Sequence, residues 1–228
     1  MKKVLSALCA LALISCTWNV HLGNGKNGKS VTCKGPVVTK SFDLADFNAI
    51  VINGHADLEF AQTNGTFGVS VKANEEVFQH LDYHVKNGTL FLDTVDKVNI
   101  RADEFDIYIS APTLTSIEVN GAADAKILAL NQTEKLDVEV NGAGDFELKY
   151  ITVPELSVEI NGAGDLECEG LNVGTLSIDV NGAGDVELEG KAESCQLHVS
   201  GAGDIDARKL DCADIQTSKA GLASIKTK

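Results

Sequence analysis

The chain has few aromatic residues, prolines and arginines, and each shortage limits what it can be. Phe, Trp and Tyr make up 5% of its 228 residues, so a core must be built from Val, Ile, Leu and Ala. Three prolines against 21 glycines indicate a regular backbone punctuated by glycine. Arg101 and Arg208 are the only arginines, and the formal net charge is −14. A surface of that sign repels phosphate backbones, which argues against nucleic acid as a partner.

Long apolar runs are also missing, except at the N-terminus. Residues 1–16 read MKKVLSALCALALISC, in which two lysines precede an apolar stretch of 11 residues. A membrane span needs about 20 residues, so this stretch is typical of a secretory signal instead. Leu13-Ile14-Ser15-Cys16 resembles the lipobox of bacterial lipoproteins, which implies cleavage before Cys16 and diacylation of its sulfur. We predict a signal peptide over 1–15 and lipid attachment at Cys16; an ordinary secretory signal with a chance cysteine is the alternative.

Residues 16–36 show no alternation of apolar and polar residues. They are rich in Gly, Asn and Lys, which is typical of a flexible tether. The stretch lacks an acidic cluster of the kind that marks lipoproteins for surface export. We therefore expect a protein of the cell envelope, anchored to a membrane by its lipid and facing the periplasm rather than the cell surface.

An internal repeat decides the fold class. The chain reads IEVNGAADAKI from Ile117, VEVNGAGDFEL from Val138, VEINGAGDLEC from Val158, IDVNGAGDVEL from Ile178 and LHVSGAGDIDA from Leu197. A decayed copy starts at Ile215, and an earlier relative, IVINGHADLEF, starts at Ile50. Apolar and polar residues alternate on both sides of each turn, as they do in half-buried β-strands.

Two all-β folds accommodate such units. In an antiparallel meander NGAG would be a hairpin loop; in a parallel β-solenoid it would be a corner in coils of about 20 residues. Because the copies match in register, exposed positions included, we predict the solenoid, which stacks like residues about 4.8 Å apart. It should cover 37–228, with irregular first coils and a cap over 37–116 and regular NGAGD repeats over 117–228.

The repeated corner predicts two structural columns. One is an amide ladder that satisfies backbone groups of the corner, formed by Asn120, Asn141, Asn161 and Asn181. The other is a stack of small side chains inside the corner, formed by Ala122, Ala143, Ala163, Ala183, Ala202 and Ala220.

Several segments together resemble a known family. FNAIVINGHADLEF, VKNGTLFLD, DIYISAPTLTSIEVNGAADAKI and the repeated NGAGD corners occur in an order and spacing similar to the auto-transporter adhesin family with the head GIN domain, over about residues 41–227. The resemblance implies a right-handed, single-stranded β-helix, often carried by lipoproteins of the Gram-negative envelope. It supplies no catalytic residues.

Carboxylates form three periodic columns in the predicted stack. The first contains Glu118, Glu139, Glu159 and Asp179; the second contains Asp124, Asp145, Asp165, Asp185 and Asp204; the third contains Glu147, Glu167, Glu187 and Asp206. Solubility and turn chemistry explain all three, and calcium binding by the second column is the alternative. The nine-residue calcium repeat is absent, because here Asp follows the second glycine directly. No other cofactor is expected.

The remaining chemistry is sparse. Polysaccharide-degrading β-helices place carboxylates and basic residues irregularly on one face, whereas these carboxylates are periodic. Cys33, Cys168, Cys195 and Cys212 contain no CxxC, and free buried thiols are favoured over a Cys195–Cys212 bridge. We therefore predict a non-enzymatic binding, adhesion or structural module whose partners are the membrane, through its lipid, and an envelope protein or glycan. A polysaccharide-active β-helix enzyme and a purely mechanical spacer are the alternatives.

Overall fold

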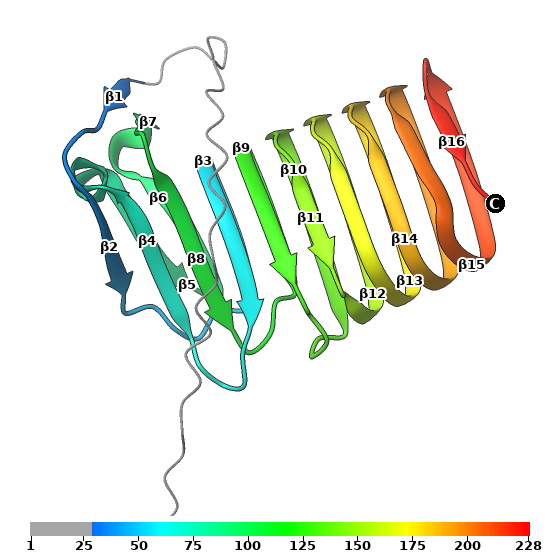
Figure 1. Ribbon diagram of the computed structural model, residues 1–228, viewed down its shortest axis with the longest axis horizontal. Coiled ribbons are helices and arrows are strands. Elements are labelled where there is room, and N and C mark those ends of the chain that lie inside the picture. Colours follow the sequence, from blue (N-terminus) through cyan, green and yellow to red (C-terminus); the bar gives the residue numbers. More distant parts are fainter. Residues whose placement is uncertain (1–28) are drawn as a thin grey trace, which may run out of the picture.

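The computed structural model describes residues 29–228, and strands dominate it (Figure 1). The predicted signal peptide and Cys16 lie outside the described residues. The first half contains β1 (Ser30–Thr32), β2 (Val37–Phe42), β3 (Ala49–Gln62), β4 (Gly68–Asn74), β5 (Leu81–Lys86), β6 (Thr89–Thr94), β7 (Asn99–Arg101) and β8 (Phe105–Ala111). The second half contains β9 (Ser116–Leu128), β10 (Lys135–Ala143), β11 (Phe146–Lys149), β12 (Thr152–Ala163), β13 (Leu166–Ala183), β14 (Val186–Ala202), β15 (Asp204–Gly221) and β16 (Ser224–Lys226).

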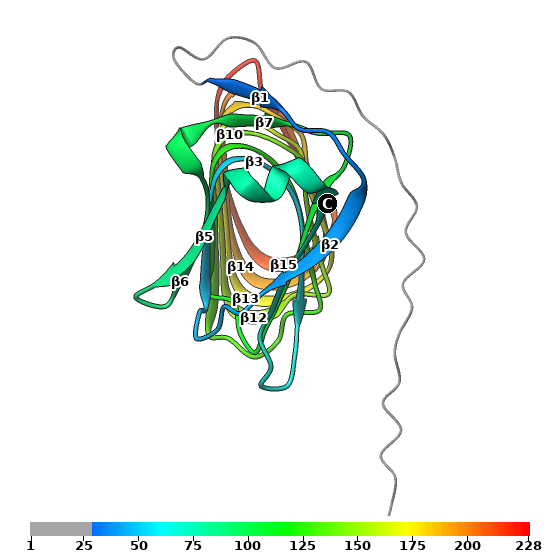
Figure 2. The ribbon, with the colours of Figure 1, turned by 90° about the vertical axis from the view of Figure 1, so that its left-hand side faces the viewer.

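The second half is a parallel β-solenoid, as predicted, with about six turns in the whole fold. Strands β9, β10, β12, β13, β14 and β15 follow one another in the sheet, and every pair is parallel. Asn141 pairs with Asn120 on one side and Asn161 on the other, so the repeats stack residue on equivalent residue. Viewed along the axis, the coils superimpose around one elongated core (Figure 2).

The inward-facing side chains of each coil form the core. Leu136, Val138 and Val140 are buried before the corner, and Phe146 and Leu148 after it. Like side chains of neighbouring coils lie above them, which gives a continuous apolar column with almost no aromatic content. Burial of that surface is the main stabilising contribution, at roughly 25 cal/mol per Å².

Glycine allows the coils to approach at the corner. Gly142 has φ +155°, and a Cβ there would lie 1.8 Å from the carbonyl oxygen of Gly121 in the preceding coil. The same contact recurs at Gly162 and Gly182. The first glycine of NGAG is therefore required by the stacking distance as well as by its backbone conformation.

The expectation that alanines fill the corner is wrong. Ala122 and Ala143 are half-buried, whereas Ala163, Ala183 and Ala202 are exposed, and Ala220 lies outside the column because it pairs with Ser200. The cause is that the alternation of strand residues continues through the corner. The two glycines of NGAGD therefore point inward, and Asn, Ala and Asp point outward. In the first repeat Ala123 replaces the second glycine, and it is buried.

The N-terminal end of the solenoid departs from parallel pairing. β8 pairs with β3 in parallel but with β4 antiparallel, and β2 closes the sheet beside β4. β5 and β6 form a hairpin, and the short helical turn Glu75–His80 lies across the open end of the coils (Figure 2). Val77 of that turn is buried, so the end of the core is covered.

Of the tether expected over 16–36, residues 16–28 lie outside the described residues, and part of the remainder is a strand. Residues 30–32 form β1, which pairs in parallel with β7. Cys33 is fully buried, and its N–H donates to the carbonyl oxygen of Arg101 at 2.8 Å. Its apolar side chain and this backbone bond attach the segment to the cap. Between residues 29 and 228, no helix is long and apolar enough to cross a membrane.

The cysteines also differ from the favoured expectation. Cys195 and Cys212 form a disulfide, with 6.7 Å between their Cα atoms and a sequence separation of 17. Cys33 and Cys168 are free and buried, and burial raises the pKa of the Cys168 thiol. The bridge joins the coil that contains β14 to the one that contains β15.

Candidate binding surfaces

The asparagines of the corners form a hydrogen-bonded ladder on the outer surface. Nδ2 of Asn161 donates to Oδ1 of Asn141 at 3.2 Å, and Nδ2 of Asn181 donates to Oδ1 of Asn161 at 3.2 Å. Asn120 continues the ladder to Asn53, which belongs to the earlier relative of the repeat. The side chains are exposed or half-buried, and their partners are amides and carboxylates rather than the corner backbone we expected.

The first acidic column supports this ladder. The second N–H of Asn120, Asn141 and Asn161 donates to Oε1 of Glu118, Glu139 and Glu159 respectively, at 2.7–2.9 Å. Asp179 has a shorter side chain and makes no such bond, and its Oδ1 is buried without a partner. The carboxylates of this column therefore serve mainly to orient the amides.

The second acidic column contains more aspartates than the NGAGD repeats supply. Asp57 pairs with Asp124 on one side and with Asp106 on the other, so the column continues across β3 and β8. Lysines lie at both ends: Lys72 pairs with Asp106 in the sheet, and Nζ of Lys226 lies 3.0 Å from Oδ2 of Asp204. Alignment of IVINGHADLEF on the repeat could have identified Asp57. Asp106 belongs to β8, which carries no copy of the repeat.

The oxygens of this column accept backbone hydrogen bonds. Oδ1 of Asp124 accepts from the N–H of Asp145 at 2.9 Å, and Oδ1 of Asp165 and of Asp185 accept likewise from the next coil at 2.8 and 3.0 Å. Burial, followed by the charges of Asp124 and Asp165, raises the pKa of Asp145. Within the described chain no three His, Cys, Asp or Glu side chains gather as a metal site would require. These backbone bonds are the turn chemistry expected of the column, and calcium binding by it stays a prediction.

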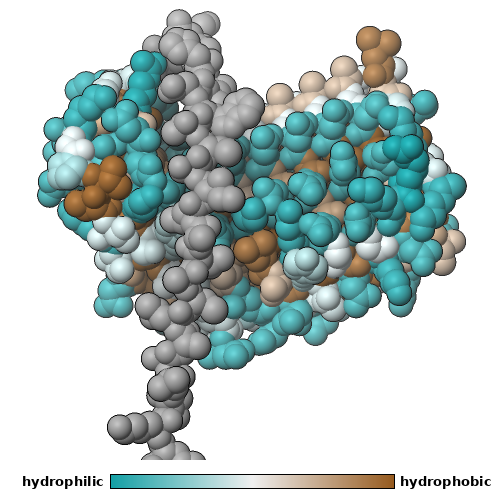
Figure 3. Space-filling view, viewed as in Figure 1, coloured by the Kyte–Doolittle hydropathy of each residue, from teal (hydrophilic) through white to brown (hydrophobic). Residues whose placement is uncertain are grey.

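The third acidic column is partly neutralised by lysines. Nζ of Lys126 lies 2.7 Å from Oε2 of Glu147, and Nζ of Lys149 lies 3.4 Å from both Glu147 and Glu169. Arg208 forms a two-pronged pair with Asp206 further along. The coils to the right of the grey trace in Figure 3 present a mainly hydrophilic surface. Glu147, Glu167 and Asp206 are engaged in ion pairs, whereas Glu187 has no ion-pair partner among residues 29–228.

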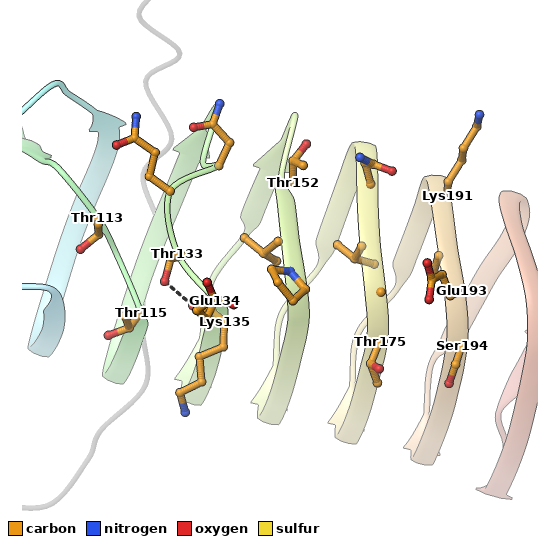
Figure 4. Close-up of a pocket in the computed structure, with 18 of the residues that line it drawn as sticks. Thr113, Thr115, Thr133, Glu134, Lys135, Thr152, Thr175, Lys191, Glu193 and Ser194 are labelled. Carbon is orange, nitrogen blue, oxygen red and sulfur yellow. Dashed lines mark hydrogen bonds between the residues drawn. The ribbon is translucent and has the colours of Figure 1, made fainter.

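A groove runs along another corner of the coils, lined by the starts of β10 and β12 and by the middles of β13 and β14. Its volume is about 1350 Å³, and its lining spans six successive passes of the chain, from Thr113 to Ala213. One wall contains Asn131, Thr152, Asn172 and Lys191, and the other contains Thr115, Lys135, Thr175 and Ser194. Between them the floor is apolar, with Val153, Val173 and Ala192 in register. The labelled side chains project from consecutive coils in Figure 4.

An exposed aromatic residue stands beside this groove. Tyr150 is 61% exposed and lies two residues before Thr152 of the groove wall. Its φ of +58° is in the left-handed region, which costs a non-glycine residue roughly 1–2 kcal/mol. Gly170 follows in the next coil, and a Cβ there would lie 2.7 Å from Cδ1 of the Tyr150 ring. Sequence reasoning missed both the groove and this ring.

A family model described as "Putative auto-transporter adhesin, head GIN domain" matches residues 46–228, which is most of the chain. The chain belongs to this family. The match begins just before β3 and includes every NGAGD corner of the head GIN domain. No curated protein matches the chain.

Solved structures share the fold of this head GIN domain. A protein from Bacteroides fragilis named a putative adhesin is 21% identical, with a TM-score of 0.69 over 87% of this chain and 100% of its own. A putative lipid binding protein and a putative adhesin, both from Parabacteroides distasonis, are 18% and 15% identical, with TM-scores of 0.53 and 0.52. Each covers 88% of this chain and 100% of its own. At such identities the likeness establishes the fold, and none of the three is named as an enzyme.

Proposed function

We propose that this protein is a lipid-anchored, non-catalytic binding module of the cell envelope, and that the groove is its adhesive surface. The observation that carries the proposal is the continuous groove, whose polar walls repeat at each coil and whose lining makes little use of the chain's abundant carboxylates. Membership of an adhesin family supports attachment as the role, and the proposal therefore places the solenoid on the cell surface rather than in the periplasm that the tether sequence favoured.

The cysteines support export. A disulfide between Cys195 and Cys212 is expected to persist outside the reducing cytosol, as in the periplasm or on the cell surface. The N-terminal sequence ending in Cys16 provides the signal and the acylation site that would hold the solenoid on a membrane.

The structure argues against the other functions considered. In the part of the chain that the structure describes, buried side chains such as Phe60 and Phe146 occupy the interior of the coils, which does not favour a lipid tail as the ligand there. An enzyme would need reactive groups converging on the groove, but its charged residues are spread along both walls. A spacer would not need the unpaired polar side chains that line it.

The test combines anchoring with attachment. Bacteria producing the full chain should carry it in the membrane fraction with an acylated N-terminus, and should attach to a layer of immobilised bacterial cells. Cys16→Ala should release the protein to the soluble fraction and abolish attachment. Cys9→Ala, which changes another cysteine of the leader, is the control and should behave as wild type. Wild-type protein without an acyl group, or cells that attach equally with and without the protein, would contradict the proposal.

A further inference from the structure

We propose that the groove binds an extended, uncharged glycan lying along the solenoid axis, with Tyr150 as a stacking platform at its border. This inference names the ligand class for the proposed function and rests on it. Four features support it: the length and repetition of the groove, the unpaired state of its polar groups, its low charge, and the exposed ring.

The groove has the shape that a linear polymer needs. Its lining crosses six passes of the chain, and coils in a parallel stack lie about 4.8 Å apart, so the groove is about 24 Å long. Wall residues are presented once per coil: Thr175 pairs in register with Ser194, and Asn172 with Lys191. A ligand built of repeating units can therefore make similar contacts at successive coils.

Several wall side chains are free to bind a ligand, although the hydroxyl of Thr115 donates to the carbonyl oxygen of Asn48. Thr152, Asn172 and Thr175 are exposed, and their side chains make no hydrogen bond among residues 29–228. By contrast, the side chain of Asn161 in the corner ladder donates two hydrogen bonds and accepts one. The amide of Asn172 is therefore available to a ligand, whereas that of Asn161 is already bonded within the protein. Hydroxyl and amide groups both donate and accept, which matches the hydroxyl groups of a sugar.

The charge of the groove favours an uncharged ligand. Its lining holds Lys135 and Lys191 against Glu134, Glu193 and Asp211, a difference of one negative charge in a chain of −14. The amine of Lys135 is engaged by Asp137. A strongly anionic polymer would find no basic path along the walls, and a cationic one would bind the acidic columns on the other faces instead.

Tyr150 supplies the apolar contact that a sugar ring requires. Its backbone has a positive φ, as have Ala129 and Gly170 at the equivalent corners of the neighbouring coils. Only at Tyr150 does this strained conformation carry a large exposed ring. Gly170 leaves space for that ring beside the next coil. An exposed aromatic face can pack against the C–H face of a pyranose while the ligand's hydroxyls reach the groove wall.

Extended peptides and lipids match the groove less well. A peptide that adds as a strand needs free N–H and C=O groups, but β12, β13 and β14 pair with neighbours on both sides. An amphipathic helix or an acyl chain needs a broad apolar groove, whereas the floor here is a narrow line through Val153, Val173 and Ala192.

The experiment uses the full chain carrying Cys16→Ala, which has no acyl group to insert into lipid, and immobilised mannan, laminarin and xylan as uncharged glycans. Polygalacturonate, casein and phosphatidylcholine vesicles represent anionic polymers, peptides and lipids. Retention should occur on at least one uncharged glycan, without cleavage. Tyr150→Ala and Asn172→Ala should each weaken it about tenfold, which corresponds to 1.4 kcal/mol. Gln196→Ala removes an exposed amide outside the groove and should change retention less than twofold.

The outcomes separate this inference from the proposed function. Retention on casein, vesicles or polygalacturonate alone would overturn it, as would cleavage of the glycan. Glycan binding that is unchanged in Tyr150→Ala and Asn172→Ala, or equally reduced in Gln196→Ala, would overturn the groove as its site. If bacteria attach but no uncharged glycan retains the protein, the inference fails and the binding function stands. If attachment itself is absent, both fail.

Discussion

Removal of one amide from the corner ladder should destabilise the solenoid measurably. In Asn161→Ala three hydrogen bonds disappear: those from Nδ2 to Asn141 at 3.2 Å and to Glu159 at 2.9 Å, and the one accepted from Asn181 at 3.2 Å. The neighbouring coils then keep a donor and an acceptor that face each other across a gap too wide for a direct bond.

The magnitude follows from the number of bonds and their exposure. A hydrogen bond contributes a net 0.5–1.5 kcal/mol to stability, roughly, and the half-buried ladder belongs at the low end because its partners can bind water. Three such bonds give a loss of about 2 kcal/mol. For a domain of this size 1 kcal/mol shifts the melting temperature by roughly 2–4 °C, so Tm should fall by about 4–8 °C.

Thermal unfolding followed by circular dichroism measures the effect. Asn172→Ala is the matched control, because Asn172 is an exposed asparagine whose side chain makes no hydrogen bond in the described chain. Its Tm should stay within about 1–2 °C of wild type, as is usual for exposed substitutions. If the two variants melt at the same temperature, the ladder contributes nothing and the reasoning is refuted.

Three further predictions concern the corner, the disulfide and the half-buried carboxyl of Asp106. Gly182→Ala should prevent folding or lower Tm far more than Gly54→Ala: both positions have positive φ, but the added Cβ lies 1.9 Å from a carbonyl oxygen at the first and meets nothing within 4 Å at the second. Equal effects would mean that backbone strain alone matters. Replacing Cys195 and Cys212 together by alanine should cost about 3 kcal/mol, since the bridge closes a 17-residue loop, and dithiothreitol should lower the Tm of wild type but not of the double variant. Burial, and next the neighbouring carboxyl of Glu104, raise the pKa of Asp106 from 3.8 to about 6. The stabilising contribution of protonated Asp106 is therefore complete below about pH 4 and is lost as the pH rises through 6. Asp106→Asn, which cannot ionise, should gain stability relative to wild type between pH 4 and pH 7, and a constant difference in Tm would contradict the shift.

The repeat made the parallel stack predictable, because its alternation and its register are both visible in the residues. Val138 and Val158 occupy equivalent positions and face the same core, as the pattern requires. The prediction failed at the corner alanines such as Ala163, since it assumed that the turn would interrupt the alternation. In the structure the strand pattern continues through the two glycines.

The candidate site could not be read in the same way. The groove walls come from the segments between repeats, where Thr152, Asn172 and Lys191 align in space but share no residue type. The disulfide was the less favoured alternative for a related reason: Cys195 pairs in the sheet with Ile215, and Cys212 with Ala192, so the register does not place the two cysteines opposite each other. Their Cα atoms nevertheless lie 6.7 Å apart.

Separation of stability from binding tests the central claim that the corners are scaffold and the groove is the working surface. The measurement is retention of Asn161→Ala and Asn172→Ala on the surface that wild-type protein binds, at a temperature at which both variants are folded. Asn161→Ala should be retained like wild type despite its lower Tm. Asn172→Ala should lose about tenfold in retention while melting like wild type. Full retention of Asn172→Ala together with loss of binding in folded Asn161→Ala would contradict the claim and assign recognition to the corner ladder.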